Sequence, residues 1–459
     1  MRRRISVFII VASIATLTSV FAADPAELGV KGPFEIGFTS FILTDTSRPG
    51  DGGPYPNRPI PVYVWYPVDP QDVSSSTPLA EYPLDPLYDP YGLGVSTSAD
   101  WEAYGLDRAY QEPVPSQEGP FPVLVFSPGW GAAAWFHTSV GTRLASHGFV
   151  VAVVYHFGDQ MWAWEPPYDH IALASWNRPR DVSFVLTDIL NRNQTPGDLF
   201  DGLLMPDKIA ASGWSLGGYA AMVLAAGDDL VCDIFYEPGW EWAGPVPDGL
   251  CYPTPPDPRI QAIVPLDGSN QVLWFTELAR VAIPAMGMGE EWSYLALDPP
   301  WASWQARQHA AFSGHPAYRV DVFNTNHQSF SDLCEGYQVL GDLGILSPDD
   351  VAYVLALLCD GMTPSGEVHR LVTQYTLAFL KTNLLGESGY QSMLTPGYAL
   401  RREPLIEFFV TERRNPHSIG DDWPDDFIYF MHQPGHETSH AAMNSQESLP
   451  VVRAGFPLR

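Results

Sequence analysis

The sequence contains one motif that is typical of nucleophilic catalysis, the GxSxG pattern GWSLG at residues 213–217. An apolar stretch, 208–212, precedes it, and a small-residue stretch of helical length, 217–226, follows it. A strained turn from strand to helix needs Gly at both ends of this motif, because side chains there would collide with neighbouring backbone. The helix start contributes free N–H groups and the positive end of the helix dipole. Ser215 is therefore the candidate nucleophile.

A serine nucleophile needs a base to accept its proton and an acid to orient that base. In chains with this turn, the order along the sequence is serine, acid, histidine. Asp267 follows the apolar run 260–266, so its carboxylate is expected at the carboxyl edge of a parallel strand, where ligands bind. Glu290 or Glu291, at the end of the next run, is the alternative acid, and we prefer Asp267.

The candidate base is His327, the one histidine of twelve that directly follows the last predicted core strand, 318–323. His315 precedes that strand and His369 falls within a predicted helix, so both are expected to be surface or packing residues. The tail histidines are also set aside, because their spacing matches no metal site; they are His417, His432, His436 and His440. We expect neither a metal ion nor an organic cofactor.

The loop at residues 128–131, PGWG, follows the apolar run 121–126 and is the candidate oxyanion loop. An oxyanion hole in this setting takes one backbone N–H from the residue after the nucleophile and one from such an earlier loop. Leu216 and Trp130 are therefore the expected donors. The alternative is that residues 128–131 form an ordinary turn.

Short apolar runs alternate with helix-length segments from residue 121 onward, which indicates a mostly parallel, doubly wound α/β sheet with helices on both faces. The expected strands are 34–43, 59–66, 121–126, 149–155, 208–212, 260–266, 282–288 and 318–323; the expected helices are 139–146, 180–191, 217–226, 304–311 and 365–384. The architecture would be an α/β-hydrolase fold with an insertion and a C-terminal extension.

The chain divides by composition into four parts. Residues 1–23 have the charged, apolar, small-residue order of a secretory signal peptide, with an uncleaved anchor as the alternative. Residues 24–120 supply N-terminal strands and a covering loop of the catalytic domain. Residues 121–385 form the α/β core, interrupted by an insertion at about 228–259, and residues 386–459 are an extension without an assigned role.

Charge and cysteine content narrow the partners and the compartment. The formal net charge of −29 excludes nucleic acid and disfavours anionic membranes, because nothing would neutralise phosphates. Four cysteines allow three pairings, and proximity in sequence favours Cys232 with Cys251 and Cys334 with Cys359. A protein that is exported can oxidise them, so we expect a secreted or periplasmic protein without stable membrane insertion.

Over residues 33–335 the chain resembles the bacterial relatives of plasma-type platelet-activating factor acetylhydrolase, α/β-hydrolases grouped loosely with dienelactone hydrolases. The resemblance is carried by FSPGWG at 126–131, LASHGFVV at 144–151, GWSLGG at 213–218, LD at 266–267 and HQSFSD at 327–332. It implies the acid, base and oxyanion donors named above, and short-chain acyl esters or platelet-activating-factor-like phospholipids as substrates. The chain departs from the family at Pro128, where the family commonly has His.

These observations predict a secreted serine carboxylic ester hydrolase that acts through an acyl-enzyme on a small ester or lipid. One alternative is a polyester or cutin hydrolase, because GWSxGG also occurs in secreted polyesterases, which usually carry the acid one strand later. An alternative of another class is a non-catalytic α/β-hydrolase-fold binding protein. Such proteins usually lack the serine or the histidine.

Overall fold

The computed structural model of the 459-residue chain describes residues 25–50, 53–87, 89, 92–159, 170–229, 232, 235–236, 244–245, 252–270, 273–291 and 303–411. The predicted signal peptide, Cys251 and the four tail histidines lie outside these residues. Much of the predicted insertion at 228–259 and all of the extension beyond residue 411 lie outside them as well.

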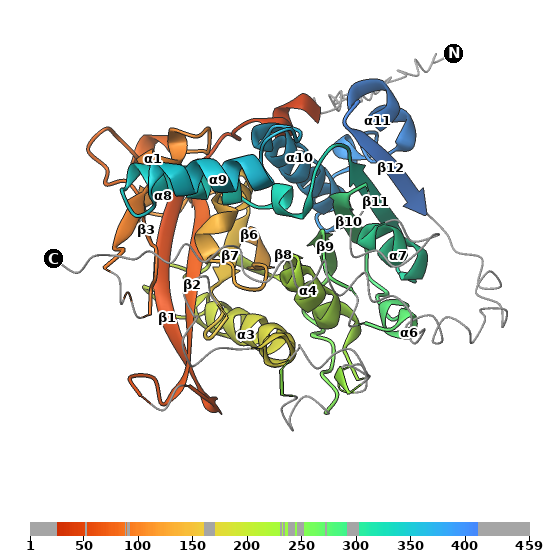
Figure 1. Ribbon diagram of the computed structural model, residues 1–459, viewed down its shortest axis with the longest axis horizontal. Coiled ribbons are helices and arrows are strands. Elements are labelled where there is room, and N and C mark those ends of the chain that lie inside the picture. The colour runs from red at the N-terminus through yellow and green to blue at the C-terminus, as the bar shows by residue number, and fades with distance from the viewer. Residues whose placement is uncertain are drawn as a thin grey trace, which may run out of the picture.

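The described residues form a ten-stranded sheet in the order β12-β11-β10-β9-β8-β6-β7-β2-β1-β5 and a two-stranded sheet of β3 and β4 (Figure 1). The strands are β1 (Glu35–Pro49), β2 (Asn57–Val68), β3 (Glu81–Pro83), β4 (Val95–Thr97), β5 (Tyr110–Gln111), β6 (Phe121–Ser127), β7 (Val150–Val154), β8 (Leu204–Trp214), β9 (Ala262–Leu266), β10 (Ala285–Glu290), β11 (Ala317–Val322) and β12 (Ile406–Thr411). Strands β6 to β11 pair in parallel, whereas β2 pairs antiparallel with β7 and β12 with β11. The predicted mostly parallel α/β sheet is confirmed.

Helices cover both faces of the sheet (Figure 1). They are α1 (Ser98–Glu102), α2 (Thr138–Ser146), α3 (Ile171–Arg192), α4 (Leu216–Ala226), α6 (Phe275–Leu278), α7 (Trp304–Ala311), α8 (Leu333–Asp342), α9 (Pro348–Leu358), α10 (Ser365–Asn383) and α11 (Pro396–Arg402). One buried apolar cluster joins the sheet to α2, α8 and α10, and a second joins it to α3, α4 and α6.

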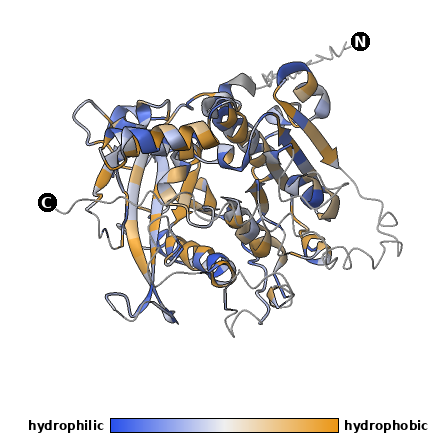
Figure 2. Cartoon of the chain, viewed as in Figure 1, coloured by the Kyte–Doolittle hydropathy of each residue, from blue (hydrophilic) through white to orange (hydrophobic). Residues whose placement is uncertain are grey.

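The apolar runs form strands because both of their faces are buried. Every residue of β6, β7 and β9 is buried, which is why these strands show no polar alternation in the sequence. In Figure 2 the strands in the middle of the sheet are mostly hydrophobic, whereas α3 and α10 carry both hydrophobic and hydrophilic residues. Buried strands covered by amphipathic helices thus account for the alternation of apolar runs with helix-length segments in the sequence.

Several elements go beyond the sequence prediction. Strand β12 comes from the predicted extension, so the sheet continues past residue 385. Helix α3 begins at Ile171, although the sequence predicted a start near residue 180. The prediction missed the first half of the helix because proline usually interrupts helices, and Pro179 lies inside this one. Helices α8 and α9 follow His327, and a disulfide joins Cys334 at the start of α8 to Cys359 just after α9. That predicted pair is confirmed.

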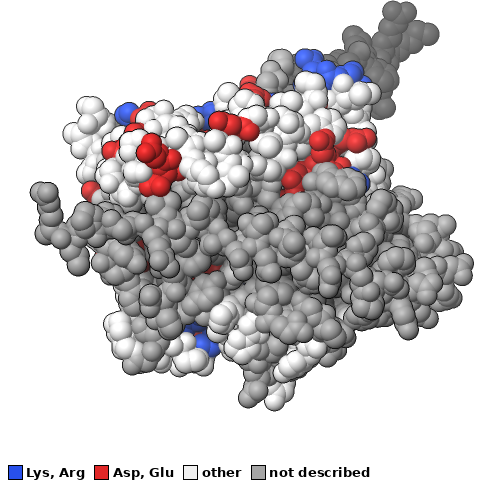
Figure 3. Space-filling model, viewed as in Figure 1, with Lys and Arg blue, Asp and Glu red and all other residues white. Residues whose placement is uncertain are grey.

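The acidic composition is visible on the surface. Figure 3 shows patches of Asp and Glu on the upper part of one face, with few Lys and Arg beside them. Exposed acids of the α8–α9 region include Asp342, Asp349 and Asp360. Within the described ranges, no helix combines the length and the apolar character that a membrane crossing requires.

Candidate active site

Ser215 lies in a sharp turn between β8 and α4. Its backbone has φ 56° and ψ −123°, a conformation that costs a non-glycine residue energy and is found at functional sites. The flanking glycines are required by close backbone contacts. A Cβ on Gly213 would lie 2.4 Å from the carbonyl carbon of Gly217, and a Cβ on Gly217 would lie 1.8 Å from the carbonyl oxygen of Ser127. The turn leaves Ser215 partly exposed among buried neighbours.

The structure brings the predicted acid and base into contact. The Nδ1 atom of His327 lies 2.5 Å from Oδ2 of Asp267, whose side chain is fully buried. Because a carboxylate only accepts hydrogen bonds, Nδ1 carries the proton and Nε2 is left as the basic nitrogen. Asp267 has φ 38° directly after β9, and its backbone N–H donates to Met288 O at 2.6 Å.

Backbone and ring contacts connect this pair to the serine turn. The N–H of Ser215 donates to Leu266 O at 3.1 Å, and the N–H of Ser269 donates to Ser215 O at 2.9 Å. The serine is therefore hydrogen-bonded to residues on both sides of Asp267. Next to it, the indole Nε1 of Trp214 donates to His327 O at 2.9 Å, and the two rings lie 5.0 Å apart. The predicted nucleophile, acid and base thus gather at the carboxyl ends of β8, β9 and β11.

Glu290, the alternative acid, lies at the end of β10 and close to Asp267. The hydrogen bond to His327 is made by Asp267. Its side chain is 4% exposed, and Oε1 has no hydrogen-bond partner among the described residues. Burial, together with the charge of Asp267, raises the pKa of Glu290 to about 9. Glu290 is therefore protonated at neutral pH. The described residues contain no group of three or more His, Cys, Asp or Glu that could hold a metal ion.

The candidate oxyanion loop, residues 128–131, packs directly against the serine turn. A Cβ on Gly129 would lie 3.3 Å from Ser215 Cβ, so the loop passes immediately beside the nucleophile. Leu216 is the first residue of α4, and its N–H has no acceptor within the helix. Trp130 follows Gly129 and is 39% exposed. Both predicted donors therefore belong to segments that border Ser215.

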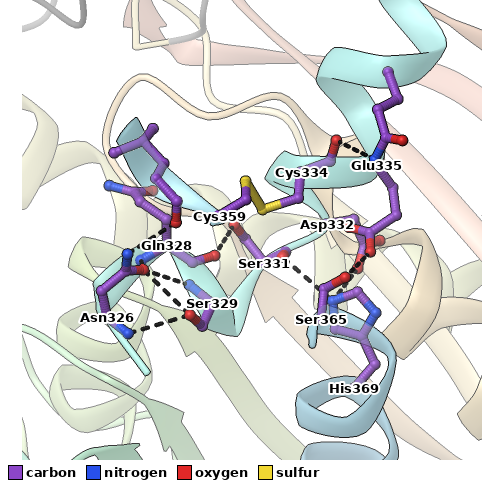
Figure 4. Close-up of a disulfide and its surroundings, with 12 residues drawn as sticks. Asn326, Gln328, Ser329, Ser331, Asp332, Cys334, Glu335, Cys359, Ser365 and His369 are labelled. Carbon is purple, nitrogen blue, oxygen red and sulfur yellow. Dashed lines mark hydrogen bonds and ion pairs between the residues drawn. A yellow bond between two sulfur atoms is a disulfide. The ribbon is translucent and has the colours of Figure 1, made fainter. Parts of the chain in front are cut away.

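Polar contacts to α2, α9 and α10 hold the segment that carries His327. Figure 4 shows Asn326, Asp332 and His369 in their surroundings. Asn326 caps the short helix η6 (His327–Phe330) by accepting from the N–H groups of Gln328 and Ser329. At the other end, Asp332 accepts from the N–H of Ser139 at 2.7 Å and lies 3.4 Å from Nε2 of His369. His369, whose side chain is 13% exposed, is thus a partner of the histidine segment.

The pKa values of Asp332 and His369 are both raised in the folded protein. Burial raises the pKa of Asp332 to about 7, although His369 opposes the shift. Burial acts to lower the pKa of His369, but Glu335 and Asp332 outweigh it and raise the value. Both groups therefore carry a proton more readily in the folded protein than in a peptide.

Sequence reasoning missed a second polar assembly, which lies behind the oxyanion loop. The Oγ of Ser127 is 2.8 Å from Nε2 of His156, and Nδ1 of His156 is 2.9 Å from Oδ2 of Asp181. Arg178 donates to Ser127 Oγ at 3.2 Å. Polar residues at strand ends, such as Ser127 after 121–126 and His156 after 149–155, were the available signal, but their partners are distant in sequence.

Comparisons with known proteins support the same architecture. A family model described as platelet-activating factor acetylhydrolase, isoform II, matches residues 104–164, a stretch that includes the oxyanion loop and ends before Ser215. A solved structure, a ferulic acid esterase from Streptomyces cinnamoneus, matches with a TM-score of 0.54 and 22% identity over 84% of this chain and 98% of that one. No curated protein sequence matches significantly. The chain has an α/β-hydrolase fold and resembles the acetylhydrolase family, as predicted.

Proposed function

We propose that this α/β-hydrolase-fold protein is a serine carboxylic ester hydrolase with Ser215 as nucleophile, His327 as base and Asp267 as acid. The observation that carries the proposal is the 2.5 Å contact between His327 Nδ1 and Asp267 Oδ2, next to the strained turn of Ser215. The partial match to the acetylhydrolase family supports an ester substrate. The full set of residues in the expected order argues against a purely binding role.

The reaction follows from the proton positions. With Nδ1–H donated to Asp267, Nε2 of His327 accepts the proton of Ser215 as Oγ attacks the ester carbonyl. The tetrahedral intermediate then collapses, and His327 passes this proton to the leaving alcohol while the acyl group stays on Oγ. A water molecule gives a proton to the same nitrogen and attacks the acyl-enzyme. As the second tetrahedral intermediate collapses, His327 passes that proton to Oγ of Ser215, and the acid product leaves.

Negative charge develops on the carbonyl oxygen in both halves of this reaction. The N–H of Leu216, at the positive end of α4, is one proposed donor to that oxygen, and the N–H of Trp130 is the other. Removing one such donor typically costs about 10²–10³ in kcat. The packing of Gly129 against Ser215 supports this arrangement, because it puts the oxyanion loop beside the reacting atoms.

We propose short-chain acyl esters as substrates, including platelet-activating-factor-like phospholipids. The reason is that the family model that covers the oxyanion loop is described as a platelet-activating factor acetylhydrolase. Polyester or cutin hydrolysis remains the second candidate. It would gain if Glu290 rather than Asp267 served as the acid, and the contact of Asp267 with His327 favours the first candidate.

We also propose that the protein is exported. The disulfide between Cys334 and Cys359 supports this location, since disulfides persist mainly in oxidising compartments. The signal-like order of residues 1–23 points the same way. Amino-terminal sequencing of the protein recovered outside the cytoplasm tests this proposal: a mature chain that starts near residue 24 is expected, and a chain that retains Met1 would contradict it.

The mechanism is tested by active-site labelling. A fluorophosphonate probe should form a covalent adduct on Ser215 in the folded wild type and none in S215A. p-Nitrophenyl esters from acetate to palmitate, together with a short-acyl phospholipid, methyl ferulate and a polyester film, then define the substrate class. Hydrolysis that persists undiminished in S215A would exclude the proposed mechanism, and a lack of both labelling and hydrolysis in wild type would exclude the function.

A further inference from the structure

Arg178, from the first half of α3, lies directly behind the oxyanion loop and contacts it at successive points. Its Nη2 donates to Gly129 O at 2.8 Å, and its Nη1 donates to Pro128 O and, at 3.2 Å, to Ser127 Oγ. Its Nε donates to Oδ2 of Asp159 at 2.6 Å. One guanidinium thus binds the end of β6 and both carbonyls that precede Trp130.

Asp159 completes this attachment from the other side of the ion pair. While Oδ2 accepts from Arg178, Oδ1 accepts from the N–H of Gly131 at 2.8 Å. The side chains of Arg178 and Asp159 are both fully buried. The residues on either side of Trp130 are therefore held by the same buried ion pair, Gly129 through its carbonyl and Gly131 through its N–H.

This attachment determines the direction of one peptide group. A trans peptide is planar, and its C=O and N–H point in opposite directions. Because Gly129 O points at Arg178, the N–H of Trp130 in the same peptide points away from Arg178. If the peptide turned over, the carbonyl would replace the N–H on the opposite side of the loop and no donor would face an oxyanion there.

The ion pair is poorly explained as a source of stability alone. A buried pair costs desolvation energy that its attraction scarcely repays, and apolar residues of similar volume are often as stabilising. A planar guanidinium, however, provides five N–H donors in a fixed geometry, which an apolar side chain or lysine cannot reproduce. The contacts to two consecutive carbonyls use this property.

The surrounding network keeps the guanidinium in place. Asp181 binds Arg58 through both oxygens, at 2.9 and 2.8 Å, and Arg48 lies 2.7 Å from its Oδ1. Burial, reinforced by Arg178, lowers the pKa of His156 to about 3, so this histidine is neutral and links Asp181 to Ser127. Arg178 is therefore surrounded by paired charges and a neutral histidine.

We propose that Arg178 is a positioning residue for the oxyanion hole: by binding Pro128 O and Gly129 O it fixes the Trp130 N–H toward the substrate carbonyl above Ser215. Arg178 does not touch substrate, because it is fully buried behind the loop. This inference rests on the proposed function and adds to it the residue that preorganises one of the two donors.

The test compares R178K with wild type. Lysine keeps the charge for Asp159 but cannot bind Ser127 and both carbonyls together. We expect kcat for p-nitrophenyl acetate to fall about 10- to 100-fold with KM within about threefold, since the lost interaction belongs to the transition state. Affinity for a trifluoromethyl ketone, which forms the oxyanion on Ser215, should fall by a similar factor, whereas a non-reactive substrate analogue should bind as before.

A matched control separates this effect from general loss of an arginine. Arg143 on α2 also pairs with an aspartate, Asp107, at 2.6 Å and donates to a backbone carbonyl, Gly29 O, at 2.7 Å. Neither partner belongs to the serine turn or the oxyanion loop. R143K should keep wild-type kcat and ketone affinity even where its thermal midpoint falls as much as that of R178K.

A second variant guards against misfolding. R178Q/D159N removes both charges together, so no unpaired ion is left in the interior, and it should show the same loss of kcat and ketone affinity. Wild-type values of kcat and ketone affinity in either folded variant would overturn the inference, as would failure of both variants to fold, which would assign Arg178 to the fold. An inactive wild type that also resists fluorophosphonate would instead remove the proposed function, and this inference with it.

Discussion

Gly217 lies so close to Ser127 that a Cβ on Gly217 would be 1.8 Å from the carbonyl oxygen of Ser127. The serine turn and the end of β6 are therefore in backbone contact, with no space for a methyl group. This contact fixes the distance between the nucleophile and the oxyanion loop. It also explains why the motif needs glycine at this position, independently of any catalytic role.

G217A should force these two backbones apart. Overpacking of this kind costs about 1–3 kcal/mol of the free energy of unfolding, and kcat should fall strongly because the turn and the oxyanion loop shift together. Urea denaturation and ester hydrolysis measure the two effects. The control is G366A in α10, where a Cβ would meet nothing within 4 Å and alanine should stabilise by up to about 1 kcal/mol. Equal behaviour of the two variants would refute the packing argument.

The assignment of the acid is tested by exchanging the two neighbouring carboxyls separately. D267N should lower kcat by about 10³–10⁴, because the amide no longer holds His327 in the tautomer with a basic Nε2. E290Q should keep kcat within about threefold, because a protonated carboxyl and an amide are both neutral. Steady-state hydrolysis of p-nitrophenyl acetate measures both. If only E290Q is inactive, Glu290 is the acid and the polyesterase alternative gains.

Glu290 should also make stability depend on pH. Its pKa in the folded protein, about 9, lies above the ordinary value of 4.5, so the unfolded chain loses this proton first as the pH rises. Between about pH 4.5 and 9 the free energy of unfolding should therefore fall, by at most about 1.4 kcal/mol per pH unit from this group. Urea denaturation of wild type and E290Q between pH 5 and 8 measures it: the stability of E290Q relative to wild type should increase with pH. A constant difference would show that Glu290 is ionised throughout.

The sequence predicted the elements that position the site because each has a strong local pattern. The buried strands read as apolar runs. The GxSxG pattern is recognisable within five residues, although the contact that excludes a side chain at Gly217 is with the distant carbonyl of Ser127. Asp267 was placed correctly at the end of β9 from its position alone, and the contact with His327 follows from parallel strands ending at one edge.

The support behind the site could not be predicted, because it depends on pairs that are far apart in the chain. The contact between Arg178 and Gly129 spans 49 residues, and that between Asp332 and Ser139 spans 193. Arg178 lies in the half of α3 that precedes Pro179 and was not predicted as helix, and nothing in the HQSFSD motif indicates that its Asp332 contacts Ser139. Only the fold shows that these buried residues meet.

The disulfide between Cys334 and Cys359 supports the segment that follows His327. It closes a loop with a sequence separation of 25 around α8 and α9, which corresponds to about 3–4 kcal/mol of reduced unfolded-state entropy. C334A/C359A should therefore lose about this amount of the free energy of unfolding in urea. At temperatures well below its midpoint the variant should keep kcat, because Asn326, Asp332 and Ser139 still hold the histidine segment. A loss of kcat in the folded variant would instead show that the disulfide itself positions His327.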